Sequence, residues 1–135
     1  MNRNLEKARS YLSECTLAIV NSAGVLTFSD HGVRTLLSLE RGSLLGAFVA
    51  DKVVGKAAAL LIVRGGALEV YAELVSEPAL EVFKKHRVLC VHGSVVPNIR
   101  NRTDTGICPM EEAVLSIDDP DEAYAILVKK TGGAK

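Results

Sequence analysis

The stretch from residue 50 to residue 77 constrains the fold more than any other part of the chain. Its first half, ADKVVGKAAALLIVRGG, is apolar nearly all round at helical spacing, and Gly65-Gly66 supplies a left-handed stop. Its second half, ALEVYAELVSE, has the period-two alternation that is typical of a strand. We expect a helix that begins at Asp51, whose carboxylate acts as its N-cap, and then a strand from Leu68 to Val75.

The residues that follow repeat the alternation of helix and strand. Ser76 to His86 returns to helical spacing, and Val88 to Val91 predicts another strand. Strands that alternate with helices through short connections run parallel, with right-handed crossovers. Earlier in the chain, Thr16 to Val20 and Val25 to Ser29 flank the turn NSAG and predict an antiparallel hairpin. The predicted sheet is therefore mixed.

Shorter patterns complete the prediction. Helices are expected at Asn4 to Glu14, Gly32 to Leu39, Pro109 to Leu115 and Asp119 to Lys130, and short strands at Ala47 to Ala50 and Val95 to Ile99. We expect residues 131–135 to form a disordered tail. This order of elements predicts an α/β fold, a three-layer α/β/α sandwich with a mixed sheet, formed by one domain over residues 1–135.

Composition and charge exclude several classes of partner. The formal net charge is zero, aromatic residues are 4% and Trp is absent, which argues against a nucleic-acid partner. No segment has the pattern of a signal peptide or a membrane span, so we expect no membrane partner. Cys15, Cys90 and Cys108 are scattered and odd in number, which is typical of free thiols. We therefore expect a cytoplasmic protein.

Three stretches of the chain resemble a known family. They are ADKVVGKAAALL, YAELVSEPAL and NRTDTGICPMEE, and they are similar to the uncharacterised family called domain of unknown function 1893. The resemblance covers most of the chain and implies a cytidine deaminase-like fold. Because domains of that fold commonly associate through their helices, it also implies a homo-oligomer.

The same resemblance allows a comparison with zinc deaminases, which carry H-x-E at one helix start and P-C-x-x-C at the next. Laid over this chain, Asp51 and Val53 take the positions of the histidine and the glutamate, and Ala79 and Val82 take those of the cysteines. One carboxylate does not make a zinc site, which needs at least three protein ligands. We therefore expect no metal, no cofactor and no deaminase chemistry.

The pocket at the former zinc position can remain after its metal ligands are lost. Two helix N-termini would still converge on it, and such ends favour anions. Lys52 and Lys56, four residues apart, would add positive charge. We expect a small anionic or nucleotide-like ligand, with ligand-binding candidates Asp51, Lys52, Tyr71, Glu73, Glu77, Asn101, Arg102 and Glu111. Each also has a plainer interpretation: Asp51 as a helix cap, the lysines as a solvated face, and Arg102 as the partner of Asp104.

Two residues are candidates for catalysis. Cys108 precedes Pro109 at a predicted N-cap, where a thiol ionises readily, and Lys56 in so apolar a helix is a candidate amine nucleophile. The alternative is that Cys108 fixes a junction between loop and helix, with Glu111 returning a hydrogen bond to its backbone. Three functions remain open: a ligand-binding domain, an enzyme that uses Cys108 or Lys56, and a homo-oligomeric interaction module.

Overall fold

The fold is built on one mixed sheet, in a computed structural model that describes residues 1–30, 32–100, 103 and 105–132. The strands are β1 (Leu17–Asn21), β2 (Gly24–Phe28), β3 (Phe48–Val54), β4 (Glu69–Ser76) and β5 (Leu89–Val96). Their order in the sheet is β2-β1-β3-β4-β5. Strand β1 is antiparallel to both neighbours, whereas β3, β4 and β5 run parallel. The mixed sheet predicted from the sequence is confirmed.

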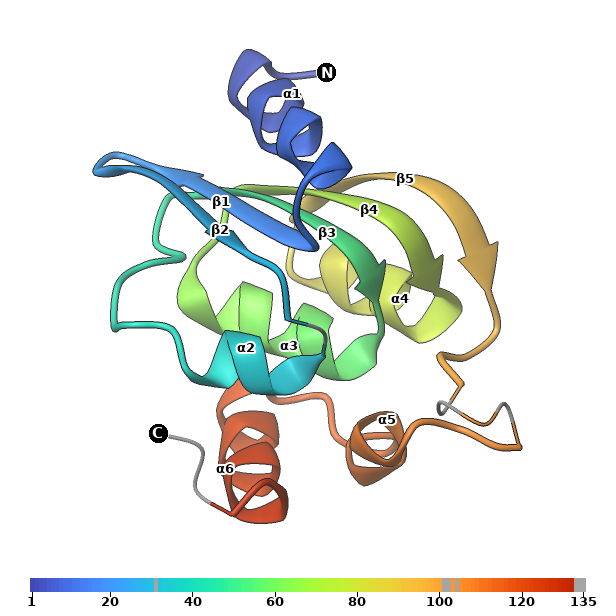
Figure 1. The fold of residues 1–135 in the computed structure, drawn as a ribbon. Helices are drawn as coiled ribbons and strands as arrows, with labels where there is room; N and C mark the ends of the chain where they lie inside the picture. Colours follow the sequence, from blue (N-terminus) through green and yellow to red (C-terminus); the bar gives the residue numbers. More distant parts are fainter. Residues whose placement is uncertain (31, 101–102, 104, 133–135) are drawn as a thin grey trace.

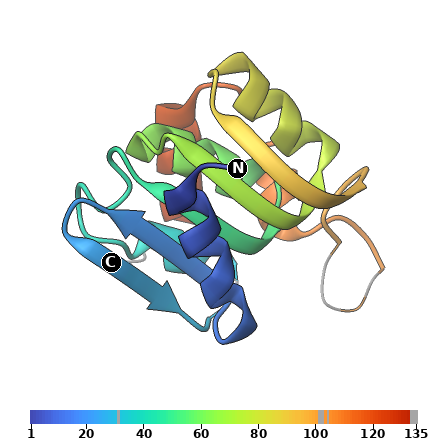
Figure 2. The ribbon, with the colours of Figure 1, turned by 90° about the horizontal axis from the view of Figure 1, so that it is seen from above.

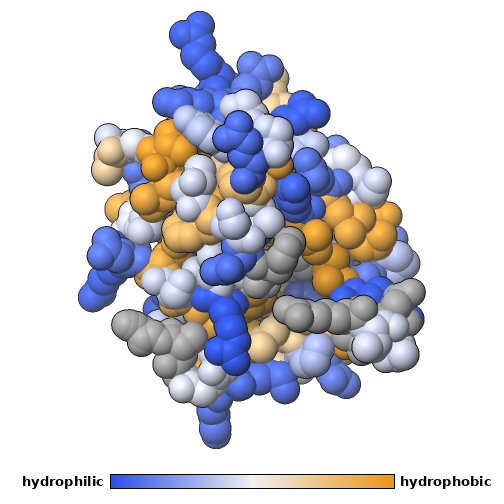
Figure 3. All heavy atoms as spheres, viewed as in Figure 1, coloured by the Kyte–Doolittle hydropathy of each residue, from blue (hydrophilic) through white to orange (hydrophobic). Residues whose placement is uncertain are grey.

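Helices cover both faces of this sheet. They are α1 (Arg3–Ser10), α2 (Val33–Leu37), α3 (Lys56–Gly65), α4 (Glu77–Lys85), α5 (Pro109–Ala113) and α6 (Pro120–Lys130), and the short 3-10 helix η1 (Tyr11–Ser13) follows α1. Helix α1 lies on one face, and α2, α3 and α4 lie on the other (Figures 1 and 2). Helices α5 and α6 lie beyond α3, on its side away from the sheet. Figure 3 shows the hydrophilic outer side of α1 at the top of the same view.

Helix α3 is the centre of the main core. Every residue from Lys56 to Ile62 is buried, because the sheet, α2, α4 and α6 surround the helix. Gly66 ends it in the left-handed conformation, with φ of 88°. The all-round apolar pattern therefore predicted a buried helix correctly. A smaller apolar cluster lies on the opposite face of the sheet, beneath α1.

The predicted start of this helix was wrong. Strand β3 continues through Asp51 to Val54, and the helix begins only at Lys56, with Gly55 as its N-cap. Asp51 pairs in register with one residue of β1 and one of β4, so it lies in the middle of the sheet. The β-branched pair Val53-Val54 suits a strand better than a first helical turn, which explains the longer strand. Lys52 and Lys56 consequently belong to different elements.

Strand β5 also differs from its prediction. It runs without a break from Leu89 to Val96, where the sequence predicted two strands, and Pro97 follows its end. Gly93 lies within this strand. A β-carbon at this position would collide with the Glu73 carbonyl of β4, so glycine allows β4 and β5 to approach each other.

The predicted C-terminal tail begins too early. Thr131 is buried, and its hydroxyl donates to the Leu127 carbonyl at 2.9 Å. Residues 133–135 lie outside the described residues. At the other end of the chain, the first helix is shorter than predicted, because α1 ends at Ser10 and the 3-10 helix η1 follows it.

Candidate functional site

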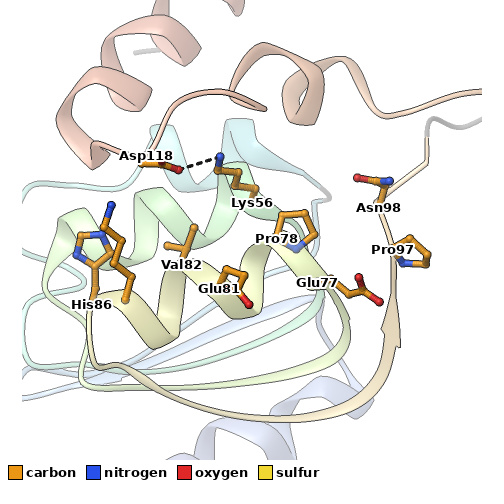
Figure 4. Close-up of a pocket in the computed structure, with 10 residues that line it drawn as sticks. Lys56, Glu77, Pro78, Glu81, Val82, His86, Pro97, Asn98 and Asp118 are labelled. Atoms are coloured by element: carbon orange, nitrogen blue, oxygen red, sulfur yellow. Dashed lines mark hydrogen bonds and ion pairs between the residues drawn. The ribbon is translucent and has the colours of Figure 1, made fainter.

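A cleft with a volume of about 670 Å³ runs along one side of α4 (Figure 4). Residues from α4, from the start of α3, from the end of β5 and from the segment before α6 line it: Lys56, Glu77, Pro78, Glu81, Val82, Lys85, His86, Pro97, Asn98 and Asp118. His86 lies at one end of the lining residues of α4, and Pro97 and Asn98 lie beyond the other end of that helix. The cleft therefore joins the helices that follow β3 and β4.

Lys56 is the most deeply buried charge of this cleft. It is only 7% exposed. Its Nζ donates to the Leu115 carbonyl at 2.9 Å and to Asp118 Oδ1 at 3.3 Å. An ammonium group carries three N–H bonds, and these two acceptors account for two of them. Among the described residues no third acceptor contacts Nζ, and Lys56 lines the cleft.

Glu111 occupies the N-terminus of α3. Its two carboxylate oxygens accept hydrogen bonds from the amides of Lys56, at 2.5 Å, and Ala57, at 2.9 Å. Burial raises the pKa of the Glu111 carboxyl, while these amides and the charge of Lys56 act in the opposite direction. The predicted hydrogen bond from Glu111 back to Cys108 is therefore wrong, because the carboxylate caps a different helix.

The N-terminus of α4 is also satisfied from within the chain. Ser76 Oγ accepts a hydrogen bond from the Ala79 amide at 3.2 Å and so caps the helix. Both helix N-termini that would attract an external anion therefore already carry an oxygen of the protein.

The charges around the cleft are mixed. Glu77, Glu81 and Asp118 contribute three carboxylates, and Lys56 and Lys85 contribute two ammonium groups. Glu77 and Glu81 lie four residues apart on one side of α4, so their like charges repel. A further lining residue, His86, has its Nε2 buried without a hydrogen-bond partner within the described part of the chain. The lining therefore offers acceptors and donors in near balance.

Asp51 and Tyr71, two of the predicted ligand-binding residues, do not line the cleft. Asp51 is partly buried in β3, and burial raises its carboxyl pKa to about 7, although the amides of Val53 and Lys52 lower it. Tyr71 faces α1 on the opposite side of the sheet, where the Arg9 guanidinium lies 4.7 Å from its ring centroid.

Other predicted residues are also scattered. Lys52 and Glu73 do not line the cleft, and Asn101 and Arg102 lie outside the described residues, as does Asp104. Of the predicted ligand-binding residues, Glu77 lines the cleft. Glu111 does not line it but accepts a hydrogen bond from the amide of Lys56, which does.

Cys108 is the N-cap residue of the short helix α5 and is partly exposed. Its thiol makes no capping hydrogen bond, and the residue does not line the cleft. The two catalytic candidates, Cys108 and Lys56, therefore do not share one cavity. Across the described ranges, no group of three His, Cys, Asp or Glu residues is arranged to hold a metal ion.

Sequence reasoning missed most of the cleft. Six of its residues follow the helical period of α4: Glu77, Pro78, Glu81, Val82, Lys85 and His86. That spacing was visible in the sequence and marks one side of a helix. No sequence signal places Asp118 or Asn98 opposite that side, because only the fold brings them there.

The fold and the cleft define an α/β domain with a mixed five-stranded sheet and a polar cleft beside two crossover helices. The family model TM1506, a domain of unknown function (DUF1893), matches residues 7–131. The chain belongs to this family.

A similar solved structure is the crystal structure of a DUF1893 family protein (TM1506) from Thermotoga maritima at 2.70 Å resolution. It has a TM-score of 0.84 and 25% sequence identity, over 96% of this chain and 92% of that one. No curated protein matches the chain. Within the described residues, no helix has the length and apolar character needed to span a membrane.

Proposed function

We propose that the chain is a ligand-binding domain whose site is the cleft along α4. The observation that carries the proposal is Lys56, a nearly buried ammonium group on the cleft wall with one N–H left for a ligand. Burying a charged group costs free energy unless its hydrogen bonds are made. The Leu115 carbonyl and the exposed Asp118 meet only part of that need for Lys56, so its third N–H needs an acceptor. A ligand that completes its hydrogen bonds provides one.

The composition of the lining favours a particular class of ligand. Lys56 offers a donor on one side, while Glu77 and Glu81 offer acceptors along α4. Pro78 and Val82 add apolar surface between them. This arrangement suits a small neutral or zwitterionic molecule with an acceptor on one edge and N–H donors on another, such as a nucleoside or an amino acid.

An anionic ligand, which the sequence led us to expect, has less support. That expectation depended on helix N-termini and on two lysines along one helix. Glu111 and Ser76 already satisfy the N-termini, and Lys52 belongs to β3. Carboxylates also outnumber ammonium groups around the cleft, so a phosphate would meet repulsion there.

Thermal denaturation and calorimetry with four sets of compounds test the proposal: nucleosides, their monophosphates, amino acids and polyamines. A ligand at about 100 times its Kd adds about 2.7 kcal/mol to the free energy of unfolding. We expect at least one nucleoside or amino acid to raise the melting temperature of the wild type. Lys56→Met should abolish that shift and Lys84→Met, an exposed change on α4, should keep it. Equal binding by both variants would contradict the assigned site.

The proposal includes a cytidine deaminase-like fold without the zinc ligands. Its support is the strand order, with an antiparallel β1 and crossover helices after β3 and β4. The helix start that corresponds to H-x-E is Gly55-Lys56-Ala57 rather than the stretch at Asp51, and the one that corresponds to P-C-x-x-C is residues 78–82 (PALEV). None of these residues is histidine or cysteine. We propose a cytoplasmic location on the same sequence grounds as before.

A second candidate function is self-association, and β5 favours it. This strand of eight residues contains no Asp, Glu, Lys or Arg, and within the described part of the chain it pairs only with β4. Figure 3 shows hydrophobic surface on the side of the molecule where β5 lies, and Val95 is 42% exposed. Uncharged open edges are templates for strand pairing. Analytical ultracentrifugation of the wild type, Val95→Lys and, as a control on the other edge, Leu26→Lys tests this candidate.

A further inference from the structure

The segment from Pro109 to Asp118, here called the strap, reaches the wall of the cleft at Asp118 and is attached to α3 by side chains. Glu111 bonds the first two amides of α3, and Lys56 Nζ bonds the Leu115 carbonyl and Asp118. We propose that the strap is a movable wall that opens while the rest of the domain stays folded, with Glu111 as its latch. This inference rests on the proposed function only in treating the cleft as the binding site.

The packing of the strap differs from that of the body it touches. Val114 is its one fully buried apolar side chain, and Met110 and Ile117 are only partly buried. Glu112, Leu115, Ser116 and Asp118 are exposed, and no regular structure connects α5 to α6. Segments with few buried apolar side chains open at a lower free energy than the core. The strap therefore depends on its polar attachments to stay closed.

The Glu111 latch is itself finely balanced. Two amides hold its carboxylate, but the carboxylate gives up hydration to reach them, which is why burial raises its pKa. Lys56 is the charged group that faces Glu111 from α3, and Glu112 and Asp118 are the other charges on the strap. Because burial of the carboxylate opposes the hold of the two amides, this contact is one that can release while the core stays folded.

Opening would change the site in two ways. Asp118, whose side chain is 68% exposed, would leave the wall and widen the cleft. Lys56 would lose both acceptors on the strap and turn all three N–H bonds toward the cleft. The strap thus controls both access to the cleft and the number of donors that a ligand meets.

Native-state hydrogen exchange of the wild type tests the strap without any ligand. The reporters are the amides of Val114 and Ile117, which bond carbonyls within the strap, that of Glu112, which bonds the Cys108 carbonyl just before the strap, and that of Lys56, which bonds Glu111. We expect these amides to exchange by local openings that are insensitive to low urea, at least about tenfold faster than amides of β3 and β4. Exchange at the same rate as β4, with the same urea dependence, would overturn the proposal.

A matched pair of variants then identifies the latch. Glu111→Gln keeps the shape but replaces one acceptor oxygen by an NH₂ group, whereas Glu112→Gln removes an exposed charge next to it. Losing a hydrogen bond to a charged group speeds the local opening by about tenfold or more. We expect this only in Glu111→Gln, and only in the strap and the first turn of α3. A uniform acceleration across the sheet would show that Glu111 stabilises the whole fold and latches nothing.

The two proposals fail separately. Hydrogen exchange reports the strap in the ligand-free protein, so a cleft that binds none of the tested compounds leaves its result unchanged. Conversely, a rigid strap leaves the ligand titrations unaffected. If both hold, a bound nucleoside or amino acid should slow exchange at Val114 and Ile117 in the wild type, and an unchanged rate would overturn the link between strap and cleft.

Discussion

The carboxylate of Glu111 leaves no room for a β-carbon on Gly55. The backbone of Gly55 is extended, with φ of −102°, a conformation that any residue adopts. Glycine is therefore needed at this position for space and not for its conformation, because any side chain would strike the carboxylate. The hydrogen bond from the Lys56 amide to Glu111 joins the start of α3 to α5 across 55 residues of sequence.

Gly55→Ala should destabilise the protein by displacing this carboxylate. Loss of the two hydrogen bonds to a charged, buried group costs about 3 kcal/mol. In a Glu111→Ala background the added methyl group has room, so the same substitution should cost less than about 1 kcal/mol. Urea denaturation of the two single variants and the double variant measures the coupling. Additive effects would show that Gly55 and Glu111 do not interact as described.

Asp51 should make stability fall as pH rises. Its carboxyl pKa goes from 3.8 to about 7 on folding, so between these values the folded state binds more protons than the unfolded state. The stabilising contribution is complete below pH 3.8 and is lost as pH rises through about 7. One pKa unit corresponds to about 1.4 kcal/mol, which makes the loss about 2–4 kcal/mol for this partly buried group.

Asp51→Asn should remove that part of the pH dependence. Urea denaturation at several pH values should show the variant about 2 kcal/mol more stable than the wild type at pH 8 and equal to it near pH 4. Glu40→Gln, at an exposed position, is the control and should leave the wild-type profile unchanged. Glu111, whose pKa is also raised, should supply a residual slope of the same sign. A variant less stable than the wild type at pH 8 would contradict the prediction.

The three thiols should differ in reactivity. Burial raises the pKa of Cys90 to about 11, and Cys15 is buried with its Sγ donating to the Tyr11 carbonyl. Since the thiolate is the reactive form, both should react slowly. We expect an aromatic disulfide reagent to label one thiol rapidly in the native protein and Cys108→Ser to abolish that phase. Rapid labelling of Cys90 would contradict the raised pKa of its partly buried thiol.

Arg64 joins α3 to α6 by two contacts of unequal strength. Its guanidinium lies 3.8 Å from the ring centroid of Tyr124, and its Nε bonds the exposed Asp121 at 3.0 Å. Exposed ion pairs contribute about 0–1 kcal/mol, whereas cation–π stacking adds to the apolar contact of the ring. Tyr124→Ala should therefore cost at least about 1 kcal/mol more than Asp121→Asn in thermal unfolding. Equal losses would show that the ion pair dominates.

Sequence patterns predicted those helices and strands that are determined by a turn, a helix cap or a hydrophobic period within the element itself. The hairpin of β1 and β2, the period-two strand β4 and the capped helices α4 and α6 all lie within a few residues of their predicted bounds. Asp51 misled the prediction because aspartate is a good N-cap, and nothing local shows that Val53 and Val54 pair with β4.

The site was less accessible to sequence reasoning for a different reason. Lys56 was singled out because a lysine is unusual in so apolar a helix, and Glu111 was singled out as part of a motif. Their relationship could not be predicted, because no periodicity connects residues that only the tertiary fold brings together. The same holds for Asp118, which reaches Lys56 through the strap.

The long reach of the Glu111 contact also bears on how the chain is made. A ribosome releases Lys56 and its helix well before residue 111 exists, and nascent chains fold from their N-terminal end as they emerge. Until Glu111 arrives, the first amides of α3 depend on water, although the apolar surface of this helix already needs cover. The nascent polypeptide therefore passes through a stage in which α3, an apolar helix, has been synthesised but lacks the Glu111 cap at its N-terminus. That interval is where we expect assistance from chaperones to matter most for this protein.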